Sequence, residues 1–122
     1  MKTIGLIGGT GWVSTLEYYR LINEETNKLL GGHNAARCVL YSLNYADINK
    51  CNLREDHEGV YKFVLDAAIK LKNAKADFIV LCANTMHQYV DRLIEEVKLP
   101  IVHITMQLHL RLRKWDYQQL VC

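Results

Sequence analysis

The amino-acid sequence predicts an α/β fold: an open parallel four-stranded sheet with helices on both faces. Four short apolar segments are separated by amphipathic stretches of helical length, and three of these segments (3–7, 78–81 and 101–104) are mainly apolar rather than alternating, as in strands buried on both sides. A chain of 122 residues forms one domain at most, with room for one modest core. We therefore expect a single lobe in which helices connect parallel strands.

The first strand and the first helix are separated by a glycine-rich turn. The apolar run 3–7 leads into the turn 8–11 (GGTG), and Ser14 followed by Glu17 three residues later is typical of a capped helix start. The helix carries apolar residues at helical spacing and is expected to end at Gly31 and Gly32.

The middle of the chain predicts a second strand and two helical segments. Residues 37–43 alternate between two faces, with Cys38, Leu40 and Ser42 on one of them. A short helical turn is expected over 45–51 and a longer amphipathic helix over 58–72.

The last part of the sheet is predicted as strand, helix, strand. The run 78–81 is apolar and rich in β-formers, which indicates an interior parallel strand. Asn84 or Thr85 is expected to cap a helix over 86–97, which ends before Pro100, and 101–104 is expected to form the fourth strand.

Composition excludes several classes of function. The net charge is only +2 and the basic residues are dispersed, so nucleic acid is not an expected partner. The apolar runs are far shorter than the roughly 20 residues that cross a bilayer, so no membrane span is expected. Four cysteines without a CxxC pair, and an N-terminus without a secretory signal, favour a reducing, cytoplasmic location. The histidines show no metal-ligand spacing, so no metal site is expected.

The glycine turn does not have the pattern of a nucleotide site. It contains neither G-x-G-x-x-G nor the lysine of a Walker loop, and Asn44 stands where a dinucleotide site would place an acidic residue. A nucleotide-dependent enzyme is therefore disfavoured, and a small carboxylate is the better ligand for these backbone amides.

Cys82 is the strongest candidate for chemistry. It follows the third strand directly, at the sheet edge where open α/β folds bind ligands. The positive end of a following helix would favour its thiolate and lower its pKa from about 8.5 by one to several units. The alternative is that Cys82 is a small buried hydrophobe, which is the commoner role of a free cysteine.

Three separated segments together resemble the aspartate/glutamate racemase family, the cofactor-independent amino-acid racemases. They are MKTIGLIGGTGWVSTLEYYRLINE, LGGHNAARCVLYSLNYADI and ADFIVLCANTMH, in the family's order, and the resemblance covers residues 1–104. It implies two similar α/β lobes that each give one cysteine to a shared cleft, and commonly a dimer. This chain resembles the first lobe.

The resemblance also implies a site and a mechanism. Cys82 would be one of two opposed thiols, which take the α-proton from one face of the amino acid and return a proton to the other, without pyridoxal phosphate or another cofactor. The implied substrate-contacting positions are Thr10, Asn52, Ala83, Asn84 and Thr85. For Asn84 and Thr85, the alternative is ordinary helix capping.

The chain departs from the family pattern in its turn. The family usually has GGMSWEST where this chain has GGTGWVST, and often has CTNT where this chain has CANT. Aspartate and glutamate remain the expected substrates, with another small acidic or polar amino acid as the alternative. The alternative function is a non-catalytic module that binds acidic amino acids or assembles with a partner.

Residues 105–122 do not resemble the family. One permitted coding string for this segment, read from its third base, gives DATAFKIKKMGLSTIGL, which is the continuation expected in the family. We therefore expect that a one-base shift near codon 105 produced an aberrant tail, which leaves the chain without the second lobe and inactive alone in the two-base reaction. Cys122 lacks the strand and helix-start context of a catalytic thiol.

Overall fold

The computed structural model describes residues 1–103, except for the side chains of Asn84 and His103. The expectations for residue 104 and for the tail 105–122 lie outside the described residues.

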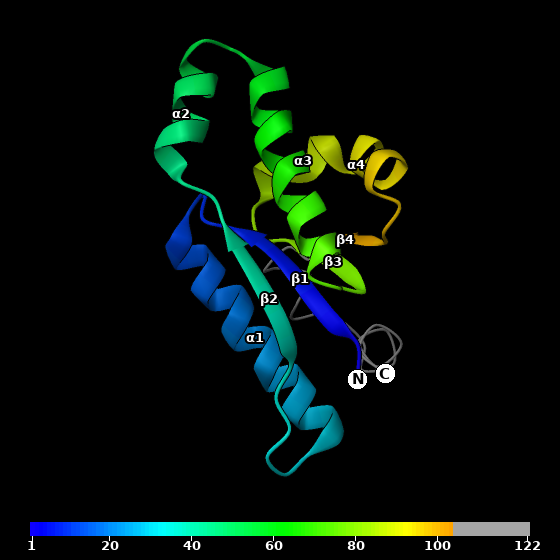
Figure 1. Cartoon of the computed structure of the whole chain (residues 1–122). Helices are drawn as coiled ribbons and strands as arrows, with labels where there is room; N and C mark the ends of the chain where they lie inside the picture. The colour runs from blue at the N-terminus through cyan, green and yellow to red at the C-terminus, as the bar shows by residue number, and fades with distance from the viewer. Residues whose placement is uncertain (104–122) are drawn as a thin grey trace.

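The fold is built on an open parallel sheet of four strands, as the sequence predicts (Figure 1). The strands stand in the order β2-β1-β3-β4. Their bounds are β1 (Thr3–Gly8), β2 (Arg37–Ser42), β3 (Phe78–Leu81) and β4 (Ile101–His103). Because β1 pairs with β2 on one side and with β3 on the other, the winding of the chain reverses between β1 and β3. In open α/β sheets, ligands bind outside the carboxyl ends of the strands at such a point.

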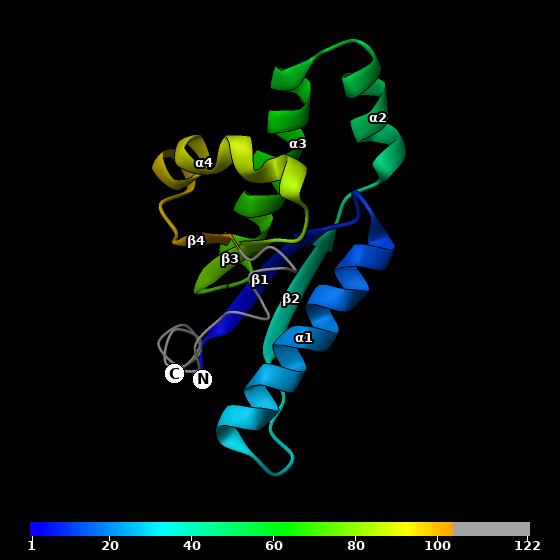
Figure 2. The ribbon, with the colours of Figure 1, turned by 180° about the vertical axis from the view of Figure 1, so that it is seen from behind.

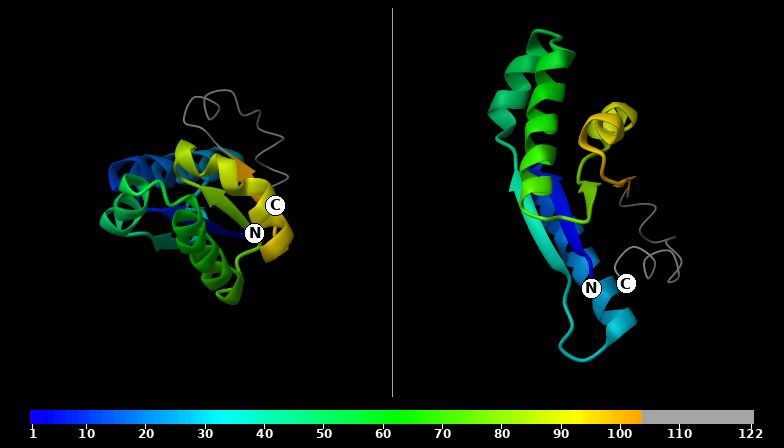
Figure 3. Two further views of the ribbon diagram at one scale, coloured as in Figure 1. Left: turned by 90° about the horizontal axis from the view of Figure 1, so that it is seen from above. Right: turned by 45° about the vertical axis from the view of Figure 1, so that its right-hand side comes forward.

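Helices cover both faces of the sheet, which confirms the predicted architecture (Figures 2 and 3). α1 (Trp12–Leu30) packs on one face, whereas α3 (His57–Asn73) and α4 (Val90–Val97) pack on the other. α2 (Tyr45–Leu53) follows β2 and lies against α3. No helix among residues 1–103 is long and apolar enough to cross a membrane.

Alternation along the strands divides the buried residues into two clusters, because successive side chains of a strand point to opposite faces. The larger α3-side cluster joins the sheet to α3 and α4, and includes Ile7, Ile79, Leu81, Val64, Leu71, Leu93 and Val97. The smaller α1-side cluster consists of Ile4, Leu6, Tyr18, Ile22, Phe78, Val80 and Cys82. The predicted alternation of β2 is also observed, because Cys38 packs against the α1-side cluster while Val39 and Tyr41 pack against the other.

The first helix begins earlier than predicted and without the predicted cap. α1 starts at Trp12, its N-cap is Gly11, and no side chain caps it. Thr15 does not cap the helix at the surface. It is buried, and its Oγ1 accepts a hydrogen bond from the backbone N–H of Gly9 at 3.0 Å. The predicted end of this helix is confirmed at Gly31.

The helix predicted over 86–97 is split into two segments. A 3₁₀ segment, η1 (Asn84–Tyr89), comes first, and α4 begins only at Val90 with Tyr89 at its N-cap. The predicted capping of an α-helix by Asn84 or Thr85 is therefore wrong. The other predicted elements agree with the structure to within two residues at their described ends.

Candidate functional site

The turn after β1 brings backbone close to the end of β2. Gly9 has a φ of 94°, and a Cβ atom at this position would collide with the carbonyl oxygen of Leu43. The N–H of Leu43 donates a hydrogen bond to the carbonyl oxygen of Gly8 at 2.7 Å, which fixes the turn against the next segment. Glycine at position 9 is therefore required by both conformation and space, and the turn presents Thr10 at the carboxyl edge of the sheet.

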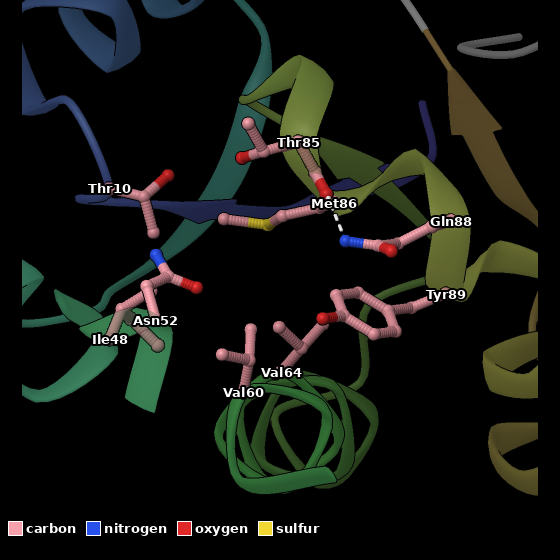
Figure 4. A pocket seen from close by; sticks show the side chains of 9 residues that line it. All are labelled: Thr10, Ile48, Asn52, Val60, Val64, Thr85, Met86, Gln88 and Tyr89. Atoms are coloured by element: carbon pink, nitrogen blue, oxygen red, sulfur yellow. Dashed lines mark hydrogen bonds between the residues drawn. The ribbon is translucent and has the colours of Figure 1, made fainter. Parts of the chain in front are cut away.

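A small pocket lies at this edge (Figure 4). Thr10 and Asn52 lie on one side of it, Gln88 and Tyr89 lie on the other, and Thr85 belongs to the same rim. Its lining is completed by the apolar residues Ile48, Val60, Val64 and Met86. The free volume is about 40 Å³, which accommodates a few water molecules or a small polar group rather than a whole amino acid.

The pocket contains a hydroxyl group whose hydrogen bonding is incomplete. Thr10 Oγ1 is buried and has no hydrogen-bond partner among the described residues. On the opposite rim, Gln88 Nε2 donates to the carbonyl oxygen of Thr85 at 3.2 Å. Since a buried hydroxyl without a partner costs free energy, the Thr10 hydroxyl marks a position where a ligand's polar atom would be stabilising.

Cys82 lies at the same sheet edge but turns its side chain into the α1-side cluster. Its backbone N–H donates to the carbonyl oxygen of Ile7 at 2.9 Å, which continues the β1–β3 pairing by one residue. The side chain is buried, with Sγ 4.0 Å from the carbonyl oxygen of Val80. Burial raises the pKa of the Cys82 thiol to about 12, and the nearby thiol of Cys38 adds to the increase.

The expected lowering of the Cys82 pKa is therefore wrong for this conformation. The prediction required an α-helix N-terminus directly after the thiol, but η1 intervenes and α4 starts eight positions later, at Val90. A helix dipole acts only within about one turn of the helix end, whereas loss of hydration acts on the thiol directly. The structure therefore holds Cys82 as a protonated thiol.

The structure brings together three of the residues expected to contact substrate and separates the others. Thr10, Asn52 and Thr85 line one pocket, although they come from three different segments of the chain. Ala83 is partly buried against the α3-side cluster, and the side chain of Asn84 lies outside the described part of the chain. Cys82 does not line this pocket.

The sequence patterns did not indicate several residues that lie near the pocket or near Cys82. Gln88 and Tyr89 follow Thr85 at three and four residues, a spacing that keeps side chains on one face of a helical segment and could have indicated them. Tyr18 of α1 was also missed. Burial raises the pKa of Tyr18, and the proximity of the Cys82 thiol contributes to this increase.

The other described cysteines do not line the pocket. Cys38 pairs in register with Ile4, near the amino end of β1, and Cys51 is buried on α2 against the α3-side cluster. All three cysteines among residues 1–103 are free. Within that range, no group of three or more His, Cys, Asp or Glu side chains gathers in a way that could hold a metal ion.

Comparison with known proteins identifies the family. The sequence profile of the Asp/Glu/Hydantoin racemases matches residues 7–113, which includes the glycine turn, the pocket residues and Cys82. The chain belongs to this racemase family.

Individual relatives agree with the assignment of this racemase lobe. The broad specificity amino-acid racemase RacX of Bacillus subtilis is 31% identical over 107 residues, which cover 83% of this chain and 45% of the relative. A crystal structure of a candidate Asp/Glu racemase from Yersinia pestis is 38% identical with a TM-score of 0.82, and the match covers 91% of this chain and 50% of that one.

An aspartate racemase homologue from Pyrococcus horikoshii is 35% identical with a TM-score of 0.77, and the match covers 84% of this chain and 45% of that one. The chain thus spans about half the length of the relatives it matches.

Proposed function

We propose that this lobe is one half of a cofactor-independent amino-acid racemase of the aspartate/glutamate type, with Cys82 as one of its two acid/base thiols. The observation that carries the proposal is the position of Cys82 directly after β3, beside the glycine turn of β1, in a chain that belongs to the racemase family. This is the point where the strand order reverses and where a ligand would meet both strand ends.

The chemistry requires a second proton-transferring group on the opposite side of the substrate. Inversion removes the α-proton from one face of the amino acid and delivers a proton to the other, so one thiol serves only one face. Among residues 1–103, Cys38 pairs with Ile4 near the amino end of β1, and Cys51 is buried in the α3-side cluster, on the opposite face of the sheet from the Cys82 side chain. We propose that the second thiol comes from a second lobe, and that this lobe alone does not complete the two-base reaction.

The pocket residues would bind one polar end of the substrate, such as its carboxylate, at the strand edge that also carries Cys82. Thr10 and Thr85 offer hydroxyl groups, Asn52 offers an amide, and Ala83 and Asn84 adjoin the thiol in the chain. Backbone and side-chain donors near the strand end would stabilise the carboxylate as negative charge develops at the α-carbon. The unpartnered Thr10 Oγ1 supports this assignment, because a carboxylate oxygen would supply the partner that the described residues lack.

The protonated state of Cys82 favours one of the two roles of a thiol. With a pKa of about 12, roughly one molecule in ten thousand carries a thiolate at pH 8. In this conformation Cys82 is suited to donate a proton, and the opposed thiol would act as the base. For the reverse direction, Cys82 would have to gain hydration or a cationic neighbour, such as the ammonium group of the substrate.

The α-proton of a bound amino acid provides the test. The chain is incubated in D₂O with L- or D-aspartate, glutamate and an uncharged amino acid, and loss of the α-proton signal is followed by NMR. We expect slow deuterium incorporation with retention of configuration, rising with pH, and no incorporation by Cys82→Ala. Cys38→Ser is the matched control, because it removes a thiol but keeps Cys82. The Cys38 thiol contributes to the raised pKa of Cys82, so the exchange by Cys38→Ser should be at least as fast as that of the wild type.

A second function is supported by the burial of the thiol and by the small pocket. A non-catalytic module that binds acidic amino acids or assembles with a partner needs the pocket but not an ionisable Cys82. Calorimetric binding of aspartate or glutamate without α-proton exchange would favour this module. Exchange by the wild type that equals the exchange by Cys82→Ala would remove the proposed catalytic role of the thiol.

Two further features belong to the proposal. The racemase family and the three free cysteines support a reducing, cytoplasmic location. The family resemblance also supports a homodimer.

The family profile extends to residue 113, nine residues into the segment 105–122. For this segment we propose the one-base shift described above, and sequencing of the gene across codon 105 provides the test. A frame that continues into DATAFKIKKMGLSTIGL and onward to a second cysteine would mean that the printed tail is a reading error. A confirmed frame for residues 105–122 would mean that the protein carries this tail.

A further inference from the structure

One flank of α1 exposes large apolar side chains that the fold leaves uncovered. Trp12 is 66% exposed, Leu16 is 56% exposed and Tyr19 is 52% exposed. Their spacing of four and three residues places them along one line of the helix surface. The face of α1 that carries Tyr18 and Ile22 is buried in the α1-side cluster, so the exposed line is a separate apolar surface.

A hydrogen bond in the second half of α1 shows which way this flank faces. Asn23 continues the line four residues after Tyr19, and its Oδ1 accepts a hydrogen bond from the backbone N–H of Ala36 at 3.0 Å. Ala36 immediately precedes β2, so the flank faces the β2 side of the sheet. Figures 1 and 2 show α1 running along β2.

Leu40 extends the same surface onto the sheet. It is 49% exposed, and it shares its face of β2 with Cys38, which packs against the α1-side cluster. We name Trp12, Leu16, Tyr19 and Leu40 the α1–β2 patch. These four side chains expose on the order of 450 Å², within the range in which an apolar patch on a monomer marks an interaction site.

The strand beside the patch is open to further pairing. β2 is an edge of the sheet among the described strands. Residues 38–42 (CVLYS) contain no charged side chain and no proline, which are the devices that normally keep an edge strand from pairing with another chain. The strand has one charge, on Arg37 at its amino end.

We propose that the α1–β2 patch binds a second copy of this chain, with the two β2 strands antiparallel about a two-fold axis that passes near Leu40. A two-fold axis perpendicular to the sheet keeps each face on the same side, so residues on the α1 face of β2 must lie opposite residues on that same face. Pairing Leu40 with Leu40 of the second copy meets this condition and sets Cys38 opposite Ser42 of the second copy.

The position of the Arg37 charge and the area of the α1–β2 patch both favour a second copy of this chain as the partner. Antiparallel pairing places the two copies of Arg37 at opposite ends of the joined strands, so the like charges are separated. The patch alone supplies more than half of the roughly 800 Å² per partner that is typical of a stable complex, and strand pairing adds backbone hydrogen bonds. The proposal rests on the homodimer proposed above and goes beyond it by naming the surface that joins the two copies. This surface lies outside the pocket and does not depend on Cys82.

Light scattering of the full chain over a roughly hundredfold range of concentration tests the proposal. We expect a dimer for the wild type and a dissociation constant at least roughly tenfold weaker for Leu40→Lys and for Leu16→Lys. Leu53→Lys is the matched control, because Leu53 is 78% exposed on α2 and lies outside the patch. This variant should remain dimeric. Circular dichroism establishes that each variant is folded.

Oxidative crosslinking provides a second measurement that does not depend on weakening the contact. If Leu40 lies at the two-fold axis, Leu40→Cys should form a disulfide-linked dimer well above the wild-type background, because paired strands bring Cα atoms within disulfide reach. Leu53→Cys should not. A wild type that is monomeric at every concentration, or a dimer that Leu40→Lys and Leu53→Lys leave equally intact, would overturn the proposal.

Discussion

The two sides of the sheet differ in how completely they are covered. On the α3 side, two helices enclose the sheet and Leu93, Val64 and Leu81 are fully buried. On the α1 side, α1 is the one helix among residues 1–103 that covers the centre of the sheet, and it leaves the α1–β2 patch exposed. The α3 side is therefore the stable scaffold, whereas the α1 side holds the thiol and the surface available to a partner.

Truncating a core side chain on each side of the sheet should have the largest effect on stability. The two losses in the free energy of unfolding show which cluster contributes more. We expect Leu93→Ala to lower the free energy of unfolding by about 4 kcal/mol, because the surrounding helices and sheet cannot close the cavity. Ile22→Ala should cost about 2 kcal/mol, because α1 is a single helix and can move inward. Urea unfolding gives both values, and a larger loss for Ile22→Ala would contradict the comparison.

The glycine turn after β1 should be the next most sensitive to substitution. We expect Gly9→Ala to lower the free energy of unfolding by about 3 kcal/mol, because the residue has a positive φ and lacks room for a Cβ atom. Gly32 also has a positive φ, but no atom lies within 4 Å of a Cβ placed there. Gly32→Ala should therefore cost only about 1 kcal/mol by thermal or urea unfolding, and equal costs would show that the Leu43 contact is unimportant.

The buried thiol should make the α1 side sensitive to alkali. The folded-state pKa of Cys82 is about 12, above that of an unfolded thiol, so its contribution to stability is complete below about pH 8.5 and is lost as the pH rises toward 12. We expect the wild type to lose about 2 kcal/mol more than Cys82→Ala between about pH 8.5 and pH 10.

Urea unfolding at several pH values measures this difference. Because Cys38 and several tyrosines also have raised pKa values, only the difference between wild type and Cys82→Ala is informative. Parallel pH profiles for the two proteins would contradict the assigned burial of Cys82.

The smallest effect on stability should come from the Thr10 hydroxyl. Thr10→Val removes a hydroxyl without a partner among the described residues, so the free energy of unfolding should change by less than about 0.5 kcal/mol. Thr15→Val, which removes the acceptor of the Gly9 N–H, should cost about 1.5 kcal/mol. If Thr10 contacts substrate, calorimetry should show weaker amino-acid binding by Thr10→Val despite its unchanged stability.

The architecture was predictable because hydrophobic periodicity and glycine positions are local signals. The run 78–81 and the stop at Gly31 appear in the structure where the sequence placed them. The start of α1 was misplaced because Ser14 and Glu17 have the pattern of a capping box, whereas Thr15 is buried beside Gly9 and sets the real turn. Such a contact depends on the path of the backbone, which periodicity does not show.

The site was only partly predictable for a similar reason. The resemblance to the racemases implied a shared site for Thr10, Asn52 and Thr85, and these three residues line one pocket in the structure. Their contact with substrate stays a prediction. The pKa of Cys82 depends on the direction of its side chain and on the interposed η1 segment, and both are tertiary properties. The apolar composition of 78–81 showed that the thiol follows a buried strand, but not that the side chain itself is enclosed.

The pairing of Thr3 with Asp77 has a consequence for how the chain folds. The N–H of Thr3 donates to the Asp77 carboxylate at 2.7 Å, and the N–H of Asp77 donates to the carbonyl oxygen of Thr3 at 2.8 Å. These two hydrogen bonds join residues 74 positions apart and set the register of β1 against β3. During synthesis, β1 leaves the ribosome first but has one unpaired side until Asp77 and β3 follow. Formation of this long-range contact should therefore limit the folding rate, and an arrested nascent chain that ends before residue 77 should be prone to aggregation.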